Sequence, residues 1–396
     1  MLYLLVNHCL LLRFMKLAFY SNYLNHHQVL VADELYRLLG DEYRFVATLP
    51  RNEEELKGGI DYSSRPYCIL AGESEGARAE AMRLAREAGV CMFGACSQEY
   101  AVERARQKDC GLSFEVGERW LKRGWVNILS PRLREWWWNY QRYYRNKPFY
   151  KLCSSAFAAE DDRKMFAYKD RHFKWGYFTR VDENFVVEAP RNLGVSTSEI
   201  TTHIMWCSRF LRWKHPELPV RMALKLKEQG YNFMLDMYGS GEEEEATKQL
   251  AKALGVEDVV KFHGALPNEE ILEAMRKHDI FLFTSDRYEG WGAVANEAMA
   301  NGCVLVASNA IGSTPYLIIE GRNGFSFKSE DVESLTDCVK RLLDNPTDMY
   351  RMQQDARNTM VTMWSPKKAA GALLTLINDL QNNRECSVLN GPCSKA

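Results

Sequence analysis

Short apolar runs alternate with segments of helical periodicity along most of the chain. Both helix-like segments of the first half end at a glycine, Gly40 and Gly89, and glycine is a common helix terminus. Continuous apolar runs separated by helices are typical of parallel sheets, so the pattern predicts an α/β fold. In the first half, the strand-like runs are 16–20, 43–49, 67–71 and 90–93, and the helix-like segments are 28–39 and 75–88.

The alternation is more regular in the second half of the chain. Two strand–helix arrays of similar size predict two Rossmann-like domains that face a cleft, with ligands at the carboxyl ends of the strands. The strand-like runs of this half are 202–207, 233–237, 259–263, 280–284 and 304–307, and the helix-like segments are 220–229, 243–254, 269–277, 293–301 and 366–380.

The composition changes at 182–202, where proline, glycine and a cluster of serine and threonine interrupt the pattern. We expect the two domains to connect there. Residues 1–14 are apolar but lack a basic start and a cleavage site, and Met15 precedes the first strand-like run. We interpret 1–14 as an upstream extension; a weak membrane anchor is the alternative. The expected organisation is 1–14 extension, 15–185 N-terminal domain, 186–365 C-terminal domain, 366–381 helix crossing back to the N-terminal domain, and 382–396 flexible tail.

Composition and charge exclude several classes of protein. Of 396 residues, 46% are apolar and 26% are charged, and the net charge is −1, which is ordinary for a globular protein. The balance gives no overall attraction to nucleic acid. The 11 cysteines are scattered without a C-x-x-C pair, which argues against a disulfide scaffold or structural zinc. Reduced thiols favour a cytoplasmic location.

The segment between the strand-like runs 280–284 and 304–307 concentrates the candidate chemistry. Gly290 and Gly292 allow the backbone to approach a ligand closely, and the small residues of the helix that follows leave its amides open to an anion. Glu289 and Glu297 are carboxylates that suit sugar or ribose hydroxyls. Ordinary turn and surface roles for them are equally consistent with the spacing.

The spacing Glu289-x7-Glu297 resembles the signature of retaining glycosyltransferase family four, whose members have the GT-B fold of two facing Rossmann-like domains with an inter-domain cleft. The first half resembles bacterial members through 25–28, 93–95, 99–100 and 118–124. Further segments of the second half resemble family motifs: the strand-end G-R-x-x-x-x-K at 208–214, the G-x-G turn at 239–241, the F-x-G turn at 262–264, and the loops at 309–312 and 321–325.

The resemblance implies a role for each matching residue. Arg209 and Lys214 would stabilise the negative charge of a nucleotide diphosphate leaving group. Glu289 would position the donor sugar, and these three residues form the expected catalytic set. Glu297 would bind the ribose hydroxyls, and Gly264 would leave room for the nucleobase. The donor-binding positions are therefore Gly239, Gly264, Gly290, Trp291, Gly292, Ala293 and Glu297.

The implied reaction is transfer of a sugar, with retention, from a nucleotide-sugar to a saccharide or lipid-linked acceptor, in cell-surface polysaccharide biosynthesis. The chain lacks Asp-x-Asp, so we expect neither a metal nor a cofactor. The alternatives are a catalytically silent sugar-nucleotide-binding partner subunit and a GT-B epimerase. A dehydrogenase is disfavoured because Gly239-Ser-Gly241 lacks a third glycine and is followed by four glutamates at 242–245, which would repel a pyrophosphate.

The acceptor side is less well defined by the sequence. The family often has a histidine in the middle of the N-terminal domain, but this chain has none between His27 and His172. The acceptor-side candidates are His26, His27, Glu118 and Arg119. For the two histidines a helix-cap or core role is the more common alternative.

The segment 119–151 combines nine Lys/Arg with a single acid, Glu135, and ten Trp, Tyr and Phe. Such a combination is typical of a peripheral contact with an anionic membrane. Packing of the aromatic residues into the domain core is the other explanation. Binding of single-stranded nucleic acid would also use such a surface, but the donor-site motifs argue against it.

Overall fold

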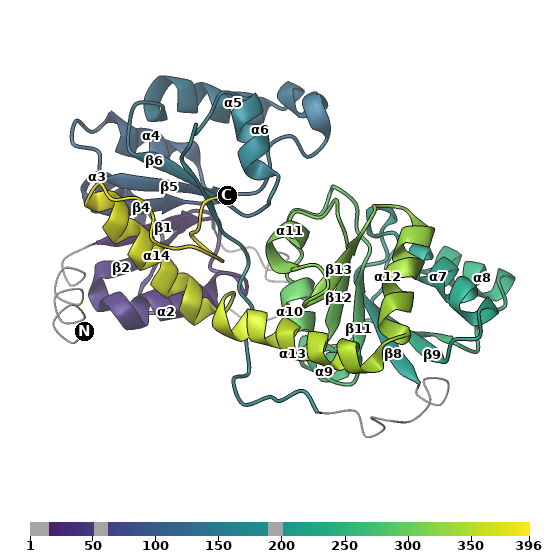
Figure 1. The fold of residues 1–396 in the computed structure, drawn as a ribbon. Coiled ribbons are helices and arrows are strands. Elements are labelled where there is room, and N and C mark those ends of the chain that lie inside the picture. Colours follow the sequence, from purple (N-terminus) through teal and green to yellow (C-terminus); the bar gives the residue numbers. More distant parts are fainter. Residues whose placement is uncertain (1–15, 51–61, 189–200) are drawn as a thin grey trace. The chain divides into compact units, whose positions relative to one another are not determined.

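The computed structural model describes residues 16–50, 62–188 and 201–396. The chain divides into two compact units (Figure 1). The first contains the residues up to Thr179 together with Pro366–Ala396, and the second contains Arg180–Ser365. The proposed extension at 1–14 lies outside the described residues, as does most of the expected connection.

The first unit is built on a sheet that has seven strands among its described residues, all parallel. The order is β3-β2-β1-β4-β5-β6-β7, so the chain reverses direction across the sheet between β1 and β4. The strands are β1 Leu17–Ser21, β2 Tyr43–Ala47, β3 Cys68–Leu70, β4 Val90–Phe93, β5 Leu112–Gly117, β6 Phe149–Cys153 and β7 His172–Lys174.

Helices cover the sheet of the first unit. Helix α14 (Pro366–Gln381) packs against α2 and β5, so this C-terminal helix belongs to the N-terminal unit (Figure 1). The others are α2 Val29–Leu39, α3 Glu75–Glu87, α4 Gln98–Arg106, α5 Pro131–Asn139 and α6 Ala158–Lys164.

The expected flexible tail at 382–396 is instead paired with the edge of the first sheet. The Lys174 amide donates to the Ser394 carbonyl at 2.7 Å, and the Cys393 amide donates to the Lys174 carbonyl at 2.7 Å. Cys393 is fully buried. An edge strand such as β7 offers backbone N–H and C=O groups that need partners, and the tail supplies them. Such backbone pairing depends little on the polarity of the side chains. The prediction of a frayed end was therefore wrong.

The second unit has six parallel strands among its described residues, in the order β10-β9-β8-β11-β12-β13. The strands are β8 Thr202–Cys207, β9 Phe233–Tyr238, β10 Val260–Gly264, β11 Ile280–Phe283, β12 Val304–Ser308 and β13 Gly324–Phe327. Successive strands leave β8 in opposite directions, which makes the carboxyl ends of β8 and β11 the switch point where α/β sheets bind ligands.

Seven helices pack on this sheet within the described part of the second unit. They are α7 Glu217–Glu228, α8 Glu244–Ala253, α9 Asn268–Met275, α10 Val294–Ala300, α11 Thr314–Leu317, α12 Val332–Leu343 and α13 Pro346–Thr362. In the parts of both units that the structure describes, none of the helices has the length and apolarity needed to cross a bilayer.

Candidate functional site

Two loops at the carboxyl ends of β8 and β9 lie against each other without intervening side chains. Gly239 has φ +121°, and a Cβ there would overlap the carbonyl oxygen of Ser208. A Cβ at Gly241 would likewise overlap the Phe210 carbonyl oxygen. The Phe210 amide donates to the Ser240 carbonyl at 2.9 Å. The glycines of the predicted turn therefore position the loop after β8 through backbone contact.

Lys214 and Glu289 form a buried ion pair next to these loops. Only 8% of Lys214 and 9% of Glu289 is exposed. The Lys214 Nζ donates to Glu289 Oε2, and the Ser285 hydroxyl donates to the same oxygen at 3.2 Å. The Lys214 ammonium also lies 4.2 Å from the centre of the Trp213 ring. Two residues predicted to serve the diphosphate and the sugar thus neutralise each other in this structure.

Gly290 and Gly292 belong to a tightly packed turn before α10. Gly292 has φ +77°, and a Cβ there would overlap the Phe283 ring, so glycine is needed on two grounds. The side chain of Trp291 is fully buried, and its Nε1 donates to Asn296 Oδ1 at 2.8 Å. The prediction that Trp291 binds the donor is therefore wrong for its side chain, which supports the turn from the core.

Glu297 presents a carboxylate with unused hydrogen-bonding capacity. It lies in α10 and is partly exposed, and the described residues form no hydrogen bond with its carboxylate. Burial raises the pKa of Glu297 to about 7. The pKa of Cys207, at the end of β8, is raised to about 12 by burial and then by the charge of Glu297. A carboxylate at the switch point suits a ligand that brings hydroxyl donors.

Arg209 and Gly264 complete the carboxyl edge of β8, β9 and β10. Arg209 is exposed, and its guanidinium has no partner among the described residues. Gly264 has φ +70° with open space where a Cβ would stand, and its carbonyl accepts from the Gly239 amide at 2.7 Å. Ala293 directly precedes α10 as its N-terminal cap. These positions leave an exposed cation and free volume at the carboxyl edge of the second sheet.

One nearby group has the composition of a metal site. Ligand atoms of His215, Asp286 and Glu330 lie within 4.8 Å of one another. Burial acts to lower the pKa of His215, but its contact with Glu217 (2.9 Å) and the other carboxylates raise the pKa overall. The neighbouring carboxylates therefore favour the charged form of this imidazole, and such a pairing needs no metal. Independence from metal stays a prediction.

Two acceptor-side candidates in the first unit lie together through a residue that the sequence did not indicate. The Tyr177 hydroxyl donates to Glu118 Oε1 at 2.9 Å, and its ring stacks on His27 with centroids 5.0 Å apart. His26 lies next to His27, and Lys122 Nζ donates to Glu118 at 2.8 Å. Burial lowers the pKa of His27 to about 4, so the imidazole is neutral at physiological pH.

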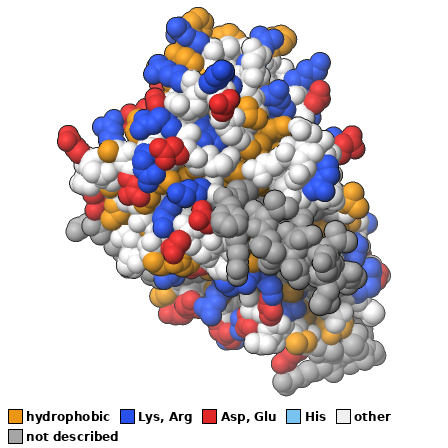
Figure 2. Space-filling view, turned by 90° about the vertical axis from the view of Figure 1, so that its left-hand side faces the viewer, with side chains coloured by type: hydrophobic (Ala, Val, Ile, Leu, Met, Phe, Trp, Pro, Cys, Tyr) orange, Lys and Arg blue, Asp and Glu red, His pale blue; other side chains and the backbone are white. Residues whose placement is uncertain are grey.

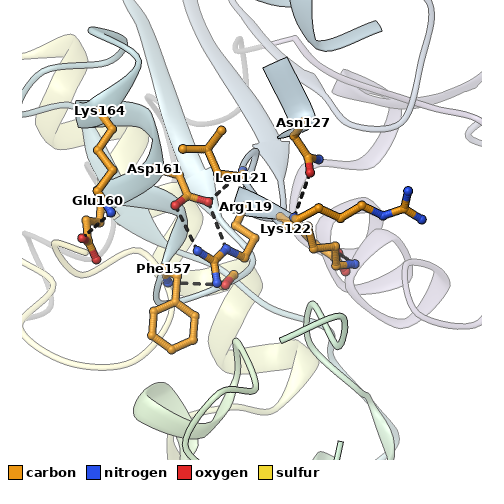
Figure 3. Close-up of polar contacts among 11 residues, drawn as sticks. Arg119, Leu121, Lys122, Asn127, Phe157, Glu160, Asp161 and Lys164 are labelled. Atoms are coloured by element: carbon orange, nitrogen blue, oxygen red, sulfur yellow. Dashed lines mark hydrogen bonds and ion pairs between the residues drawn. The ribbon is translucent and has the colours of Figure 1, made fainter. Parts of the chain in front are cut away.

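Arg119 has a structural partner instead of a free face. Its guanidinium donates to both oxygens of Asp161, at 2.9 and 3.1 Å, and lies 5.0 Å from the centre of the Phe157 ring (Figure 3). Asp161 is 1% exposed and also accepts from the Leu121 amide. The prediction of an acceptor contact for Arg119 is therefore not supported. Its partner is 42 positions away, and no local pattern indicates it.

The chain consists of two Rossmann-like units. The switch point of the second unit has closely packed glycine turns and holds Lys214, Glu289 and Glu297. These features define the class of protein: the chain has the GT-B fold. Residues 200–359 match the family model described as glycosyl transferases group 1. The matched residues lie in the second unit, and the match agrees with the resemblance noted in the sequence.

Solved structures of low sequence identity share the fold. The Anabaena protein HepE in complex with UDP has a TM-score of 0.65 at 15% identity, covering 93% of this chain and 100% of that chain. Sucrose-phosphate synthase from Thermosynechococcus elongatus has a TM-score of 0.64 at 16% identity, with the same coverage.

Curated relatives match this chain over part of its length. A D-inositol 3-phosphate glycosyltransferase of Corynebacterium aurimucosum is 28% identical over 42% of this chain and 40% of its own length. A GDP-mannose-dependent mannosyltransferase of Mycolicibacterium smegmatis is 25% identical over 46% of this chain and 49% of its own length. The chain therefore spans less than half of the length of these relatives.

Proposed function

We propose that the chain is a glycosyltransferase that moves a sugar, with retention, from a nucleotide-sugar to a saccharide or lipid-linked acceptor in cell-surface polysaccharide biosynthesis. The observation that carries the proposal is the carboxylate of Glu297: it has no hydrogen-bond donor among the described residues, at the switch point of a unit that matches the glycosyl transferases group 1 model. The names of relatives that include GDP-mannose and UDP support a nucleotide-sugar donor.

The proposed chemistry follows from where the charges stand. As the glycosidic bond breaks, the diphosphate gains negative charge, and the unpaired Arg209 is available to stabilise that charge. Lys214 supplies a second cation once the ligand competes with Glu289 for its ammonium. Glu289 positions Lys214 and the donor sugar. The sugar becomes oxocarbenium-like, and the leaving phosphate accepts the acceptor's proton on the same face.

The proposed partners are the two substrates and an anionic membrane that the segment 119–151 contacts at the inner face; nucleic acid, a metal and a cofactor are not part of the proposal. A catalytically silent partner subunit or a GT-B epimerase remains the alternative. Product analysis with and without acceptor separates them, because only transfer requires an acceptor.

A nucleotide screen tests the donor site directly. The UDP, GDP, ADP and dTDP sugars should include one that raises the melting temperature of the chain, with or without EDTA, because binding to the folded state stabilises it. Arg209→Ala should weaken that binding by about tenfold or more, as loss of a charge-assisted contact. The matched control is Arg221→Ala, which removes another exposed arginine, in α7. Normal binding by both variants, or no shift with any nucleotide-sugar, contradicts the assignment.

The pKa of Glu297 predicts a pH dependence of donor binding. Hydroxyls donate to the ionised carboxylate, so binding of a nucleotide-sugar should be about tenfold weaker at pH 6 than at pH 8, around a pKa of about 7. A nucleotide-sugar has no phosphate ionisation near neutrality, so the profile reports the protein. Isothermal titration calorimetry measures both affinities. Glu297→Gln should bind weakly and with a flat profile, whereas Glu269→Gln, an exposed control, should keep the slope.

The same raised pKa makes Glu297 a burden on the stability of the free protein. Its folded pKa lies above the unfolded value of 4.5, so its contribution to stability is complete below pH 4.5 and is lost as the pH rises through about 7. Glu297→Gln should therefore be more stable than the parent chain at pH 8 while binding the donor less well. An unchanged pH profile in Glu297→Gln would assign the titration to another group.

A further inference from the structure

The first unit carries a cluster of large apolar side chains that face solvent. The exposed fractions are 60% for Trp125, 76% for Leu129, 59% for Trp138 and 84% for Phe166. With Val126 (65%), these residues form what we call the aromatic patch. They come from the turn Gly124–Leu129, from α5 and from the turn after α6. Scattered exposed apolar residues are normal, but Trp125, Trp138 and Phe166 line one hollow, and a gathering of large exposed apolar side chains marks an interaction surface.

A hollow of about 840 Å³ opens within the aromatic patch. Its lining is apolar apart from three charged residues, Arg134, Glu135 and Lys164. Two of these three residues, Arg134 and Lys164, are cations. The apolar lining includes Trp125, Ile128, Trp137, Trp138, Met165 and Phe166.

Phe166 has an unusual backbone conformation, which neighbouring side chains hold in place. Its φ of +55° lies in the left-handed region, which bulky side chains rarely adopt. The turn is held by Trp137 Nε1, which donates to the Met165 carbonyl at 2.8 Å, and by Gln141, which donates to the Phe166 carbonyl at 3.2 Å. A strained backbone that is fixed by two side chains points to function at this position.

The inner side of the same segment anchors the aromatic patch. Trp136 packs against Trp120, Tyr140 and Tyr168, with ring centroids 4.6 to 6.4 Å apart. Trp120, Tyr140 and Tyr168 are buried. The two explanations offered for 119–151 thus apply to different residues. Of its ten aromatic residues, four are buried and four are partly buried, whereas Trp125 and Trp138 are exposed.

Positive charge surrounds the aromatic patch. Between 123 and 170, eight exposed Lys/Arg stand against three exposed acids, Glu135, Glu160 and Asp170. Figure 2 shows blue side chains around orange ones in the upper part of the view, where Figure 1 places α5 and α6. The exposed cations are Arg123, Arg132, Arg134, Arg142, Arg145, Arg163, Lys164 and Lys169.

We propose that the aromatic patch docks on the surface of an anionic phospholipid bilayer, with Trp125, Trp138 and Phe166 inserted among the acyl chains. This proposal rests on the membrane contact of the proposed function and deepens it by naming the residues that insert. One of them, Phe166, lies outside 119–151. Indole rings favour the membrane interface, and cations around them meet lipid phosphates. A second copy fits less well, because a two-fold contact would bring two cationic rims together.

Vesicle co-sedimentation of the full chain tests this docking. Vesicles of phosphatidylcholine with about one third phosphatidylglycerol should bind the protein at least about tenfold more tightly than phosphatidylcholine alone, and high salt should weaken that binding. The triple variant Trp125→Ala, Trp138→Ala, Phe166→Ala should bind these anionic vesicles about tenfold or more weakly. The matched control Leu38→Ala, Leu389→Ala removes exposed apolar side chains elsewhere in the same unit and should bind normally.

Three results would overturn the docking proposal. The first is that the parent chain does not bind anionic vesicles at low salt, and the second is that the triple variant binds them equally well. The third is that the parent chain is a dimer and the triple variant a monomer, which would assign the patch to a second copy. Nucleotide-sugar binding, measured on the same samples, should be unchanged in the triple variant. If the parent chain bound no nucleotide-sugar, the proposed function would be contradicted. The vesicle experiment would still decide whether the aromatic patch binds a membrane.

Discussion

Replacing Lys214 by alanine should lower the free energy of unfolding of the second unit by about 3–5 kcal/mol, because it leaves the buried carboxylate of Glu289 without its cation. Within the described part of the chain, the Ser285 hydroxyl would then be the remaining donor to that carboxylate. Glycosyl transfer should also be lost, since the same ammonium is proposed to meet the diphosphate. Hydrogen exchange of the amides in β8 and β11 measures the stability of this unit within the full chain.

A second variant separates the structural and catalytic roles of this pair. Lys214→Met with Glu289→Gln removes both charges and should recover much of the lost stability, but it should not recover activity. The matched control is Lys225→Ala, which breaks an exposed pair with Glu333 and should change stability by less than about 1 kcal/mol. Full activity in the double variant would show that neither charge takes part in transfer.

The alternation of strands and helices could be predicted for most of the fold because it depends on local rules. Buried parallel strands such as Ile280–Phe283 and Val304–Ser308 are continuous apolar runs. Helix α2 ends at Gly40, whose φ of +57° is the backbone that glycine supplies without strain. The family resemblance then predicted which strand ends would carry the chemistry.

The strands β5 and β6 could not be predicted as cleanly because they carry buried charges. Lys151 was counted with the basic surface of 119–151, but it is fully buried, and its ammonium donates to Glu115 of the neighbouring strand. The rings of Trp120 and Trp136 lie about 5 Å from that ammonium. Each buried charge is tolerated only because it is paired with the other, 36 positions away in the sequence. The sequence pattern of a single segment cannot predict such a pair.

The candidate site shows the same division between local and distant information. The glycines at 239, 264 and 292 were predicted from motifs, and their positive φ values fit turns that need glycine. The pairing of Lys214 with Glu289 and the core position of Trp291 depend on contacts between separate loops. Sequence motifs therefore predicted the candidate positions, while the tertiary structure shows which of their side chains already have partners within the protein.

The close approach of two backbones at Gly239 leads to the last prediction. Gly239→Ala should destabilise the second unit by more than about 3 kcal/mol and weaken nucleotide-sugar binding by more than tenfold, because the new Cβ must displace the Ser208 carbonyl and with it Arg209. Gly230→Ala is the matched control: its φ is also positive, at +78°, but open space surrounds the new Cβ. It should lose only about 1 kcal/mol and bind normally. Thermal unfolding and calorimetry compare the two variants; equal effects would mean that backbone conformation alone, and not the contact with Ser208, requires glycine at 239.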